Sequence, residues 1–178
     1  MFANRKQLLC EIARREGELG LREFSHKAGP QIEKYLAVFR QPIYEISQQA
    51  CFLDLTQGYD WCCAFVYWCC QQAGYEIPIR ASLDSRYTLA AVGHWIEYAR
   101  NQKIWRDREK IKYLPQAGDL VIFDKLLSQN PLDHIGIVLS YDLKKKFIET
   151  AEGNVNKATG IFKRPTNETI KGYICLPI

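Results

Sequence analysis

The chain changes texture near Pro115, from helical patterns before this residue to short strand-like runs after it. Before Pro115, apolar residues recur at helical spacing in several segments. We expect these helices at residues 4–16, from about 30 onward, at 61–73 and at about 89–102. After Pro115, runs rich in β-branched and aromatic residues are separated by turns, as is typical of strands. These runs cover residues 119–124, 134–141, 145–151, 159–165 and 171–177.

This order of elements predicts the fold class. No helical pattern lies between the strand-like runs, so neighbouring strands should pair antiparallel. Helices first and strands after indicate an α+β fold, because alternation would be needed for α/β. We predict one domain over residues 1–178, with a helical half at about 1–114 and an antiparallel sheet of about five strands at about 115–178.

Composition and charge are those of an ordinary soluble globular chain, with 47% hydrophobic residues, 25% charged residues and a net charge of +4. The basic residues are scattered, and the one tight run, Lys144–Lys146, resembles a hairpin turn, so no nucleic acid partner is expected. No segment has the roughly 18 apolar residues that span a bilayer. The N-terminal stretch lacks the apolar core of a signal peptide, so we expect synthesis in the cytoplasm, with no visible signal for export.

The cysteines cluster in the stretch DWCCAFVYWCC, residues 60–70, which holds four of the seven in the chain. An odd number of cysteines without a visible signal peptide disfavours a disulfide framework. The adjacent doublets lack the spacing of structural zinc sites, and the three histidines form no close pair. We therefore expect no metal and no cofactor.

Position along the predicted helix separates the two doublets. Asp60 is a favoured N-cap residue, so the helix should begin at or just after it. Cys62 and Cys63 then lie in the first turn, where free amide N–H groups and the helix dipole favour an anion and lower the pKa of a thiol. Cys69 and Cys70 lie in the body of an apolar helix, where cysteine is typically a small hydrophobic residue. The first doublet can supply a reactive thiol, and the second is interpreted as part of the packed core.

A thiol nucleophile needs a base to take its proton. His134 opens the run HIGIVL, and Gly136 two places on leaves room for a cleft. His26, in a polar stretch, and His94, beside Trp95, are interpreted as structural or exposed. The residues alone leave the choice of base open.

Four motifs occur in a recognisable order: DWCCAFVYWCCQQAG, PQAGDLVIFD, DHIGIVL and ETAEGN. Together they resemble the CHAP family (cysteine, histidine-dependent amidohydrolases and peptidases) and, more distantly, the NlpC-type cell-wall peptidases. The resemblance spans roughly residues 5–178 and is strongest over 60–154. It implies a papain-like fold, in which the nucleophile helix packs on the C-terminal antiparallel sheet.

The resemblance also implies roles for single residues. It assigns Cys62 as the nucleophile and His134 as the general base, with Glu152 and Asn154 orienting the imidazole. Strand alternation independently puts residues 152 and 154 on one face, although Glu-Gly-Asn could instead be a plain turn. For the oxyanion, papain-like enzymes use a Gln shortly before the nucleophile, which suggests Gln57; the backbone N–H of Cys62 is the other candidate.

The implied activity is that of a cysteine amidohydrolase or peptidase acting through a thioester. The implied partner is a peptidoglycan peptide, cut either at the sugar–L-alanine amide or between amino acids of the stem or bridge. Reaching the cell wall would then require lysis-type release or a dedicated secretion route. Two alternatives stay open: an intracellular thiol isopeptidase or acyltransferase, and a non-catalytic peptide-binding module on the same fold.

Overall fold

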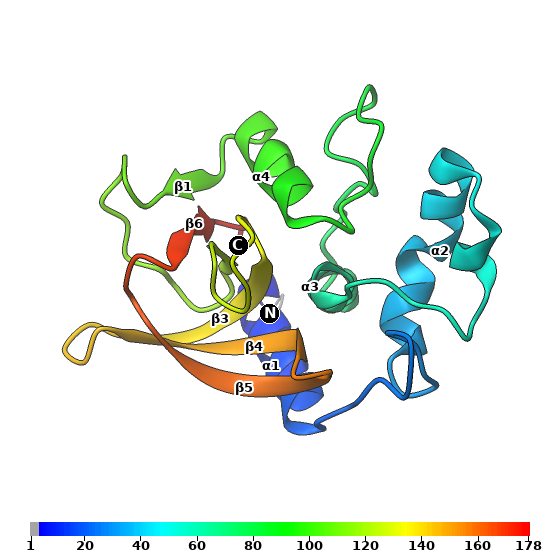
Figure 1. Cartoon of the computed structure of the whole chain (residues 1–178). Helices are drawn as coiled ribbons and strands as arrows, with labels where there is room; N and C mark the ends of the chain where they lie inside the picture. The colour runs from blue at the N-terminus through cyan, green and yellow to red at the C-terminus, as the bar shows by residue number, and fades with distance from the viewer. Residues whose placement is uncertain (1–3) are drawn as a thin grey trace.

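The structure is a computed structural model that describes residues 4–178. The helices come first along this part of the chain, as the sequence predicts (Figure 1). They are α1 (Arg5–Glu18), α2 (Glu33–Ser47), the short 3₁₀ helix η1 (Ala50–Leu53), α3 (Cys62–Gln72) and α4 (Val92–Asn101). Each helix within residues 4–178 is too short or too polar to span a bilayer.

The strands form one antiparallel sheet in the order β1-β6-β2-β3-β4-β5. They are β1 (Trp105–Asp107), β2 (Leu120–Phe123), β3 (His134–Asp142), β4 (Phe147–Val155), β5 (Ala158–Pro165) and β6 (Ile170–Ile174). The prediction of an α+β fold with antiparallel pairing is confirmed, and the described sheet has six strands where about five were expected. The additional strand, β1, has three residues, too few to show an alternating pattern, and forms by pairing with the edge of β6.

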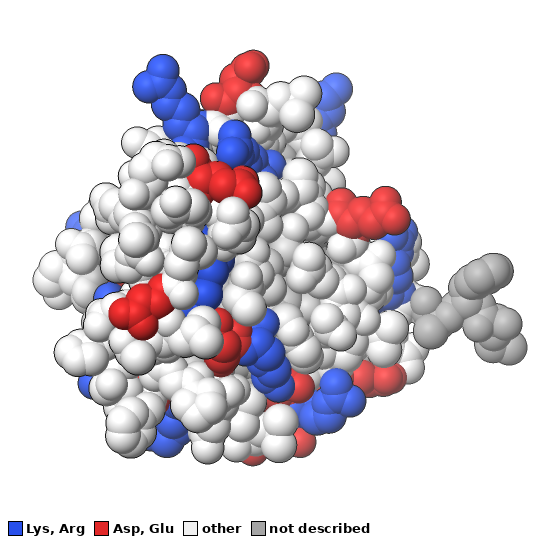
Figure 2. All heavy atoms as spheres, turned by 90° about the vertical axis from the view of Figure 1, so that its right-hand side faces the viewer, with Lys and Arg blue, Asp and Glu red and all other residues white. Residues whose placement is uncertain are grey.

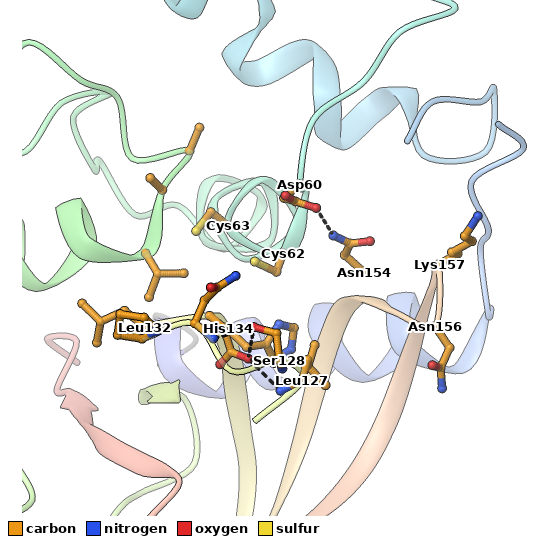
Figure 3. A pocket seen from close by; sticks show the side chains of 16 residues that line it. Asp60, Cys62, Cys63, Leu127, Ser128, Leu132, His134, Asn154, Asn156 and Lys157 are labelled. Atoms are coloured by element: carbon orange, nitrogen blue, oxygen red, sulfur yellow. Dashed lines mark hydrogen bonds between the residues drawn. The ribbon is translucent and has the colours of Figure 1, made fainter. Parts of the chain in front are cut away.

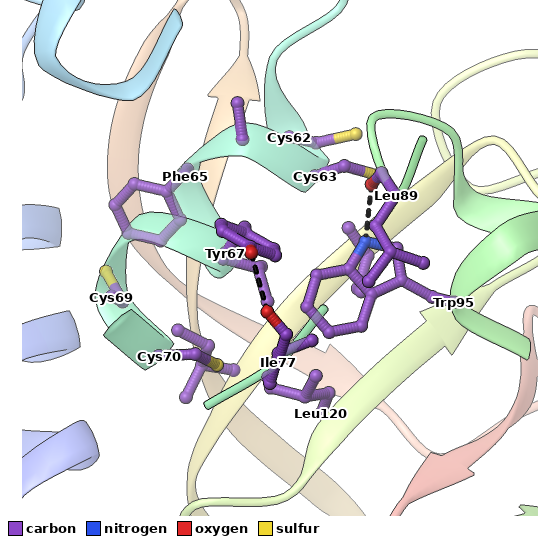
Figure 4. Packing of buried hydrophobic residues seen from close by; sticks show 14 of the residues in the cluster. Cys62, Cys63, Phe65, Tyr67, Cys69, Cys70, Ile77, Leu89, Trp95 and Leu120 are labelled. Atoms are coloured by element: carbon purple, nitrogen blue, oxygen red, sulfur yellow. Dashed lines mark hydrogen bonds between the residues drawn. The ribbon is translucent and has the colours of Figure 1, made fainter. Parts of the chain in front are cut away.

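Helix α3 is the centre of the structure. It packs against β3 and β4 on one side and against α1 and α2 on others, and Figure 1 shows it end-on between the sheet and α2. A helix contacted from several sides must be apolar nearly all round, which explains its sequence CCAFVYWCCQQ. Figure 4 shows this packing, in which the Tyr67 hydroxyl donates to the Ile77 carbonyl oxygen at 2.6 Å and the Trp95 indole N–H donates to the Leu89 carbonyl oxygen at 2.7 Å. Because these polar tips are paired, the rings are buried without an orphaned donor.

The start of α3 differs from the expectation. The N-cap residue is Trp61, so the prediction that Asp60 caps this helix is wrong. The Asp60 carboxylate instead forms an ion pair with Lys27 at 2.8 Å and accepts a hydrogen bond from Asn154 at 3.3 Å. Partners from distant parts of the chain therefore hold Asp60 in place of the local amides. Gly74 follows the helix end with φ of +80°, as expected of a helix-terminating glycine.

Charged side chains of both signs lie next to one another on the face that is at the right of Figure 1 (Figure 2). Ion pairs among the described residues, such as Lys27–Asp60 at 2.8 Å, show the same pairing of opposite charges. Charge on this face is therefore mixed, in keeping with the small net charge of +4.

Candidate active site

An open cavity of about 650 Å³ lies where the start of α3 meets the start of β3. The loop before β3, the residues that lead into α4 and the turn between β4 and β5 complete its wall. Figure 3 shows Cys62 and Cys63 on one side of the cavity, His134 on the other and Asn154 at its rim. The fold therefore brings three of the predicted site residues, Cys62, His134 and Asn154, to one cavity.

Cys62 is the first residue of α3 and is only 5% exposed. The pKa of its thiol is lowered to about 5, first by a hydrogen bond from the Cys63 thiol and then by a hydrogen bond and the charge of His134. The backbone N–H of Cys63 also lowers it, and burial opposes all of these effects. The helix start thus lowers the thiol pKa as expected, but neighbouring side chains contribute more.

His134 is the first residue of β3 and is 1% exposed. Its ring stacks on Phe123, with the centroids 6.0 Å apart, and its Nε2 hydrogen bonds Glu152 Oε2 at 2.9 Å. Because Nε2 is engaged, Nδ1 is the nitrogen left for Cys62. Burial lowers the pKa of His134, but hydrogen bonds to Cys62 and Glu152 outweigh burial and raise it to about 9. With the thiol pKa below the imidazole pKa, the proton resides on the ring, and Cys62 is a thiolate near pH 7.

Glu152 lies behind the histidine on β4 and is fully buried. Burial alone would raise its pKa, but hydrogen bonds from Arg164 and His134 lower it to about 2. Gly136 provides the room for this carboxylate, because a Cβ there would lie 2.8 Å from Glu152 Cγ. Glu152 is therefore an ionised acceptor aimed at the histidine ring, the arrangement that orients a general base.

Asn154 does not share the position of Glu152. The β4–β5 register shifts between Glu152 and Val155, and Asn154 has a left-handed backbone with φ of +63°. Its amide donates to Asp60 at 3.3 Å, at the mouth of the cavity, while the His134 ring contacts Glu152. The expectation that simple alternation puts residues 152 and 154 on one face is wrong, because a bulge re-aims the second side chain.

Gly153 explains why the Glu-Gly-Asn motif accompanies the cysteine motif. A Cβ at Gly153 would lie 2.5 Å from Phe65 Cβ and 2.9 Å from the Trp61 ring. The glycine lets β4 approach the first turn of α3, and this approach brings Glu152 behind His134. The segment is part of β4, so the alternative of a plain turn is wrong.

Gln57 is not brought to the cavity. Its side chain is exposed and lies outside the set of residues that line the cavity. Its backbone carbonyl oxygen accepts a hydrogen bond from Arg40 Nη1 at 2.8 Å, which ties this loop to α2 instead. The backbone N–H groups in the first turn of α3, at Cys62 and Cys63, are left as the candidate oxyanion donors.

The sequence did not predict two residues of the site, Thr150 and Arg164. The Thr150 hydroxyl donates to Glu152 Oε1 at 2.5 Å, and Arg164 donates to both carboxylate oxygens, at 2.9 and 2.7 Å. Strand alternation could have placed Thr150 beside Glu152. No pattern in the sequence near Arg164 indicates its role, because its contact with Glu152 depends on the register between β4 and β5. Among residues 4–178, no group of three or more His, Cys, Asp or Glu side chains is arranged to hold a metal ion.

The fold is an α+β arrangement of helices and one antiparallel sheet, in which a cysteine at a helix start and a histidine at a strand start line one cavity. Comparison with protein families matches the CHAP domain to residues 54–154, more than half of the chain. The chain belongs to the CHAP family, as its motifs predict.

Among solved structures, the chain is similar to one described as "the crystal structure of Ly7917 with the hydrolyzing product of MDP". The identity is 15% and the TM-score 0.46, with 98% of this chain and 63% of that chain covered. This chain thus spans less than two thirds of that protein. A comparison with curated proteins gives no match.

Proposed function

We propose that this protein is a cysteine amidohydrolase or peptidase that cleaves an amide bond of peptidoglycan through a thioester on Cys62. The observation that supports this most directly is that Cys62 and His134 line one cavity and shift each other's pKa, with Glu152 hydrogen bonded to His134 Nε2 at 2.9 Å. This arrangement supports roles for Cys62 as the nucleophile, His134 as the proton carrier and Glu152 as the orienting carboxylate. Membership of the CHAP family supports the same chemistry.

The reaction follows from the protonation state of the pair. The Cys62 thiolate attacks the amide carbonyl carbon, and the N–H groups at the start of α3 stabilise the oxyanion. His134 gives its proton to the leaving amine as the carbon–nitrogen bond breaks, which leaves a thioester on Cys62. Water then attacks the thioester, His134 takes a proton from that water, and the acid leaves as the thiolate–imidazolium pair is restored. Each turnover consumes one water and releases one amine and one carboxylic acid.

Charges at the cavity wall suit a polar peptide. Asp60, which is exposed and also pairs with Lys27, can receive an amine, and Lys157 can receive a carboxylate. Peptidoglycan stems carry both kinds of group, so this wall supports peptidoglycan as the substrate. The bond is either the sugar–L-alanine amide or one between amino acids of the stem or bridge.

The test is digestion of purified sacculi, followed by mass spectrometry of the soluble products. Stem peptides with a new free amine on L-alanine would assign amidase activity, and new amines elsewhere would assign endopeptidase activity. His134→Asn should abolish product formation. His26→Asn is the matched control, because His26 is exposed and lies outside the cavity wall. Intact sacculi after incubation with folded wild-type protein would reject peptidoglycan as the substrate.

A second candidate is an isopeptidase or acyltransferase that uses the same thiol. A second cavity of about 470 Å³ adjoins the first at Asp60, Ala90 and Ala91, and its lining includes Ile43 and Phe52. An apolar recess beside the nucleophile suits a large apolar substrate group, which peptidoglycan stems lack. Peptide amides that carry large or small apolar acyl groups would separate the two candidates, since only this second function predicts a preference for the large group.

A further inference from the structure

Arg164 on β5 lies behind the candidate catalytic residues, with 16% of its side chain exposed. Its Nε donates to Glu152 Oε1 at 2.9 Å, and its Nη2 donates to Glu152 Oε2 at 2.7 Å. Two roughly parallel hydrogen bonds from one guanidinium fix both the position and the plane of a carboxylate. A lysine could supply the charge at this place but could not donate two parallel hydrogen bonds from one planar group.

The remaining bonds of the carboxylate show why this orientation matters. Thr150 donates to Oε1 at 2.5 Å, and His134 Nε2 lies 2.9 Å from Oε2. Glu152 is fully buried, and a buried charge that loses its partner is strongly unfavourable. The oxygen that faces the histidine therefore stays charged and in place because Arg164 holds it from behind.

Arg164 is itself held by its own strand. Its guanidinium lies over the Phe162 ring, 4.6 Å from the centroid. Gly160 pairs with Glu152 across the sheet, and a Cβ at Gly160 would lie 2.6 Å from the Phe162 ring. The glycine thus makes room for the ring, and the ring supports the guanidinium through a cation–π contact. These contacts place Arg164 as a preorganised part of the site.

We propose that Arg164 is a positioning residue, which keeps the Glu152 carboxylate charged and in one orientation so that His134 presents its free nitrogen to Cys62. This role rests on the proposed cysteine hydrolase function. It extends the chain of contacts to a fourth residue on a third strand, in the order Cys62, His134, Glu152, Arg164.

The role has a pH signature. The titratable and charged groups that face the catalytic pair are Cys63 on α3, Glu152 on β4 and, through Glu152, Arg164 on β5, with Asp60, Asp133 and Lys157 at the cavity wall. Without Arg164, burial is the main influence on Glu152 and raises the pKa of that carboxyl. A protonated Glu152 no longer stabilises the imidazolium, so the Cys62 thiolate forms only at higher pH.

The experiment measures the rate at which iodoacetamide alkylates Cys62 as a function of pH, read by peptide mass spectrometry. Arg164→Met should move the inflection upward by about one pH unit. Lys163→Met is the matched control: it removes the same charge from the neighbouring residue, which is exposed, and should leave the inflection unchanged. Arg164→Lys should show a smaller upward shift than Arg164→Met, since lysine returns the positive charge but cannot donate two parallel hydrogen bonds. In the sacculus assay, Arg164→Met should lower kcat about tenfold or more with little change in KM.

An Arg164→Met protein that keeps the wild-type inflection would overturn the proposal. If that variant does not fold, Arg164→Gln, which keeps an amide donor toward Glu152, is judged by the same criterion. Alkylation does not depend on the substrate. A shifted inflection in a protein whose wild type leaves sacculi intact would therefore support the role of Arg164 and reject the peptidoglycan proposal alone.

Discussion

Two pairs of adjacent cysteines occupy helix α3, two turns apart, and differ in what surrounds their sulfur atoms. Cys62 and Cys63 are in the first turn, and Cys69 and Cys70 are in the last. All four are buried, with 5% exposure at Cys62 and none at the other three. Yet the pKa of Cys62 is lowered to about 5, whereas the pKa values of Cys69 and Cys70 are raised, mainly by burial.

The difference shows that burial alone does not decide the chemistry of a cysteine. Burial raises the pKa of all four thiols, and only Cys62 has donors that outweigh it: the Cys63 thiol, the His134 ring and a backbone N–H. Even its neighbour Cys63 has a raised pKa, because it is buried and donates to Cys62. One residue along the helix therefore separates the candidate nucleophile from its hydrogen-bond donor.

The largest difference between the doublets should appear in hydrolysis. Cys62→Ala should lower kcat by at least about 10³-fold, since no group replaces the nucleophile. Cys69→Ala, the same change two turns on, should keep kcat within about threefold of wild type, because Cys69 lies outside the cavity wall. Steady-state rates on sacculi, with circular dichroism to confirm folding, provide the measurement. Residual activity in Cys62→Ala close to that of wild type would exclude Cys62 as the nucleophile.

The next effect is the selectivity of alkylation. With a pKa of about 5, Cys62 is almost fully ionised at pH 7, while the thiols with raised pKa values are almost fully protonated. Limiting iodoacetamide at pH 7 should label Cys62 at least about tenfold faster than Cys63, Cys69 or Cys70. The Cys62 rate should rise through an inflection near pH 5. Preferential labelling of Cys63 would move the nucleophile by one position.

A smaller effect should separate the two members of the first doublet. The Cys63 thiol is the largest single influence that lowers the pKa of Cys62. Cys63→Ala should therefore move the Cys62 alkylation inflection upward by about one pH unit, and Cys63→Ser should move it less because the hydroxyl remains a donor. Equal inflections in Cys63→Ala and the wild type would assign the low pKa to His134 and the helix start alone.

The smallest effect should be on stability, without loss of activity. Cys70 is fully buried in the core, and truncation leaves a small void, so Cys70→Ala should lower the free energy of unfolding by about 1–2 kcal/mol. Cys51→Ala is the control: this cysteine is exposed, and the change should cost less than about 0.5 kcal/mol. Urea denaturation at constant m-value measures both. A loss of kcat in folded Cys70→Ala would show that the second doublet also acts in the site.

Local features of the fold were predictable. The nucleophile helix was expected at residues 61–73 and runs from Cys62 to Gln72. Strands β2 and β3 appear close to their predicted bounds, because a continuous apolar run between turn residues marks a strand that is buried on both faces. Two helix starts differ from the prediction: α2 starts at Glu33 rather than near residue 30, and α4 starts at Val92 rather than Leu89. Leu89 instead donates its backbone N–H to Ile79, which keeps it in the preceding loop.

The sequence by itself determined the α+β class, the family, and the two residues whose setting is local: a cysteine in the first turn of a helix and a histidine that opens a strand. The tertiary structure decided which groups support them. A bulge in β4 turns Asn154 toward Asp60 and leaves Glu152 on the histidine, and the pairing of β4 with β5 brings Arg164 to that carboxylate. Helix starts and strand alternation depend on residues a few positions apart, and a sequence displays them. Register between strands depends on the packing of the whole sheet, so only the folded chain reveals it.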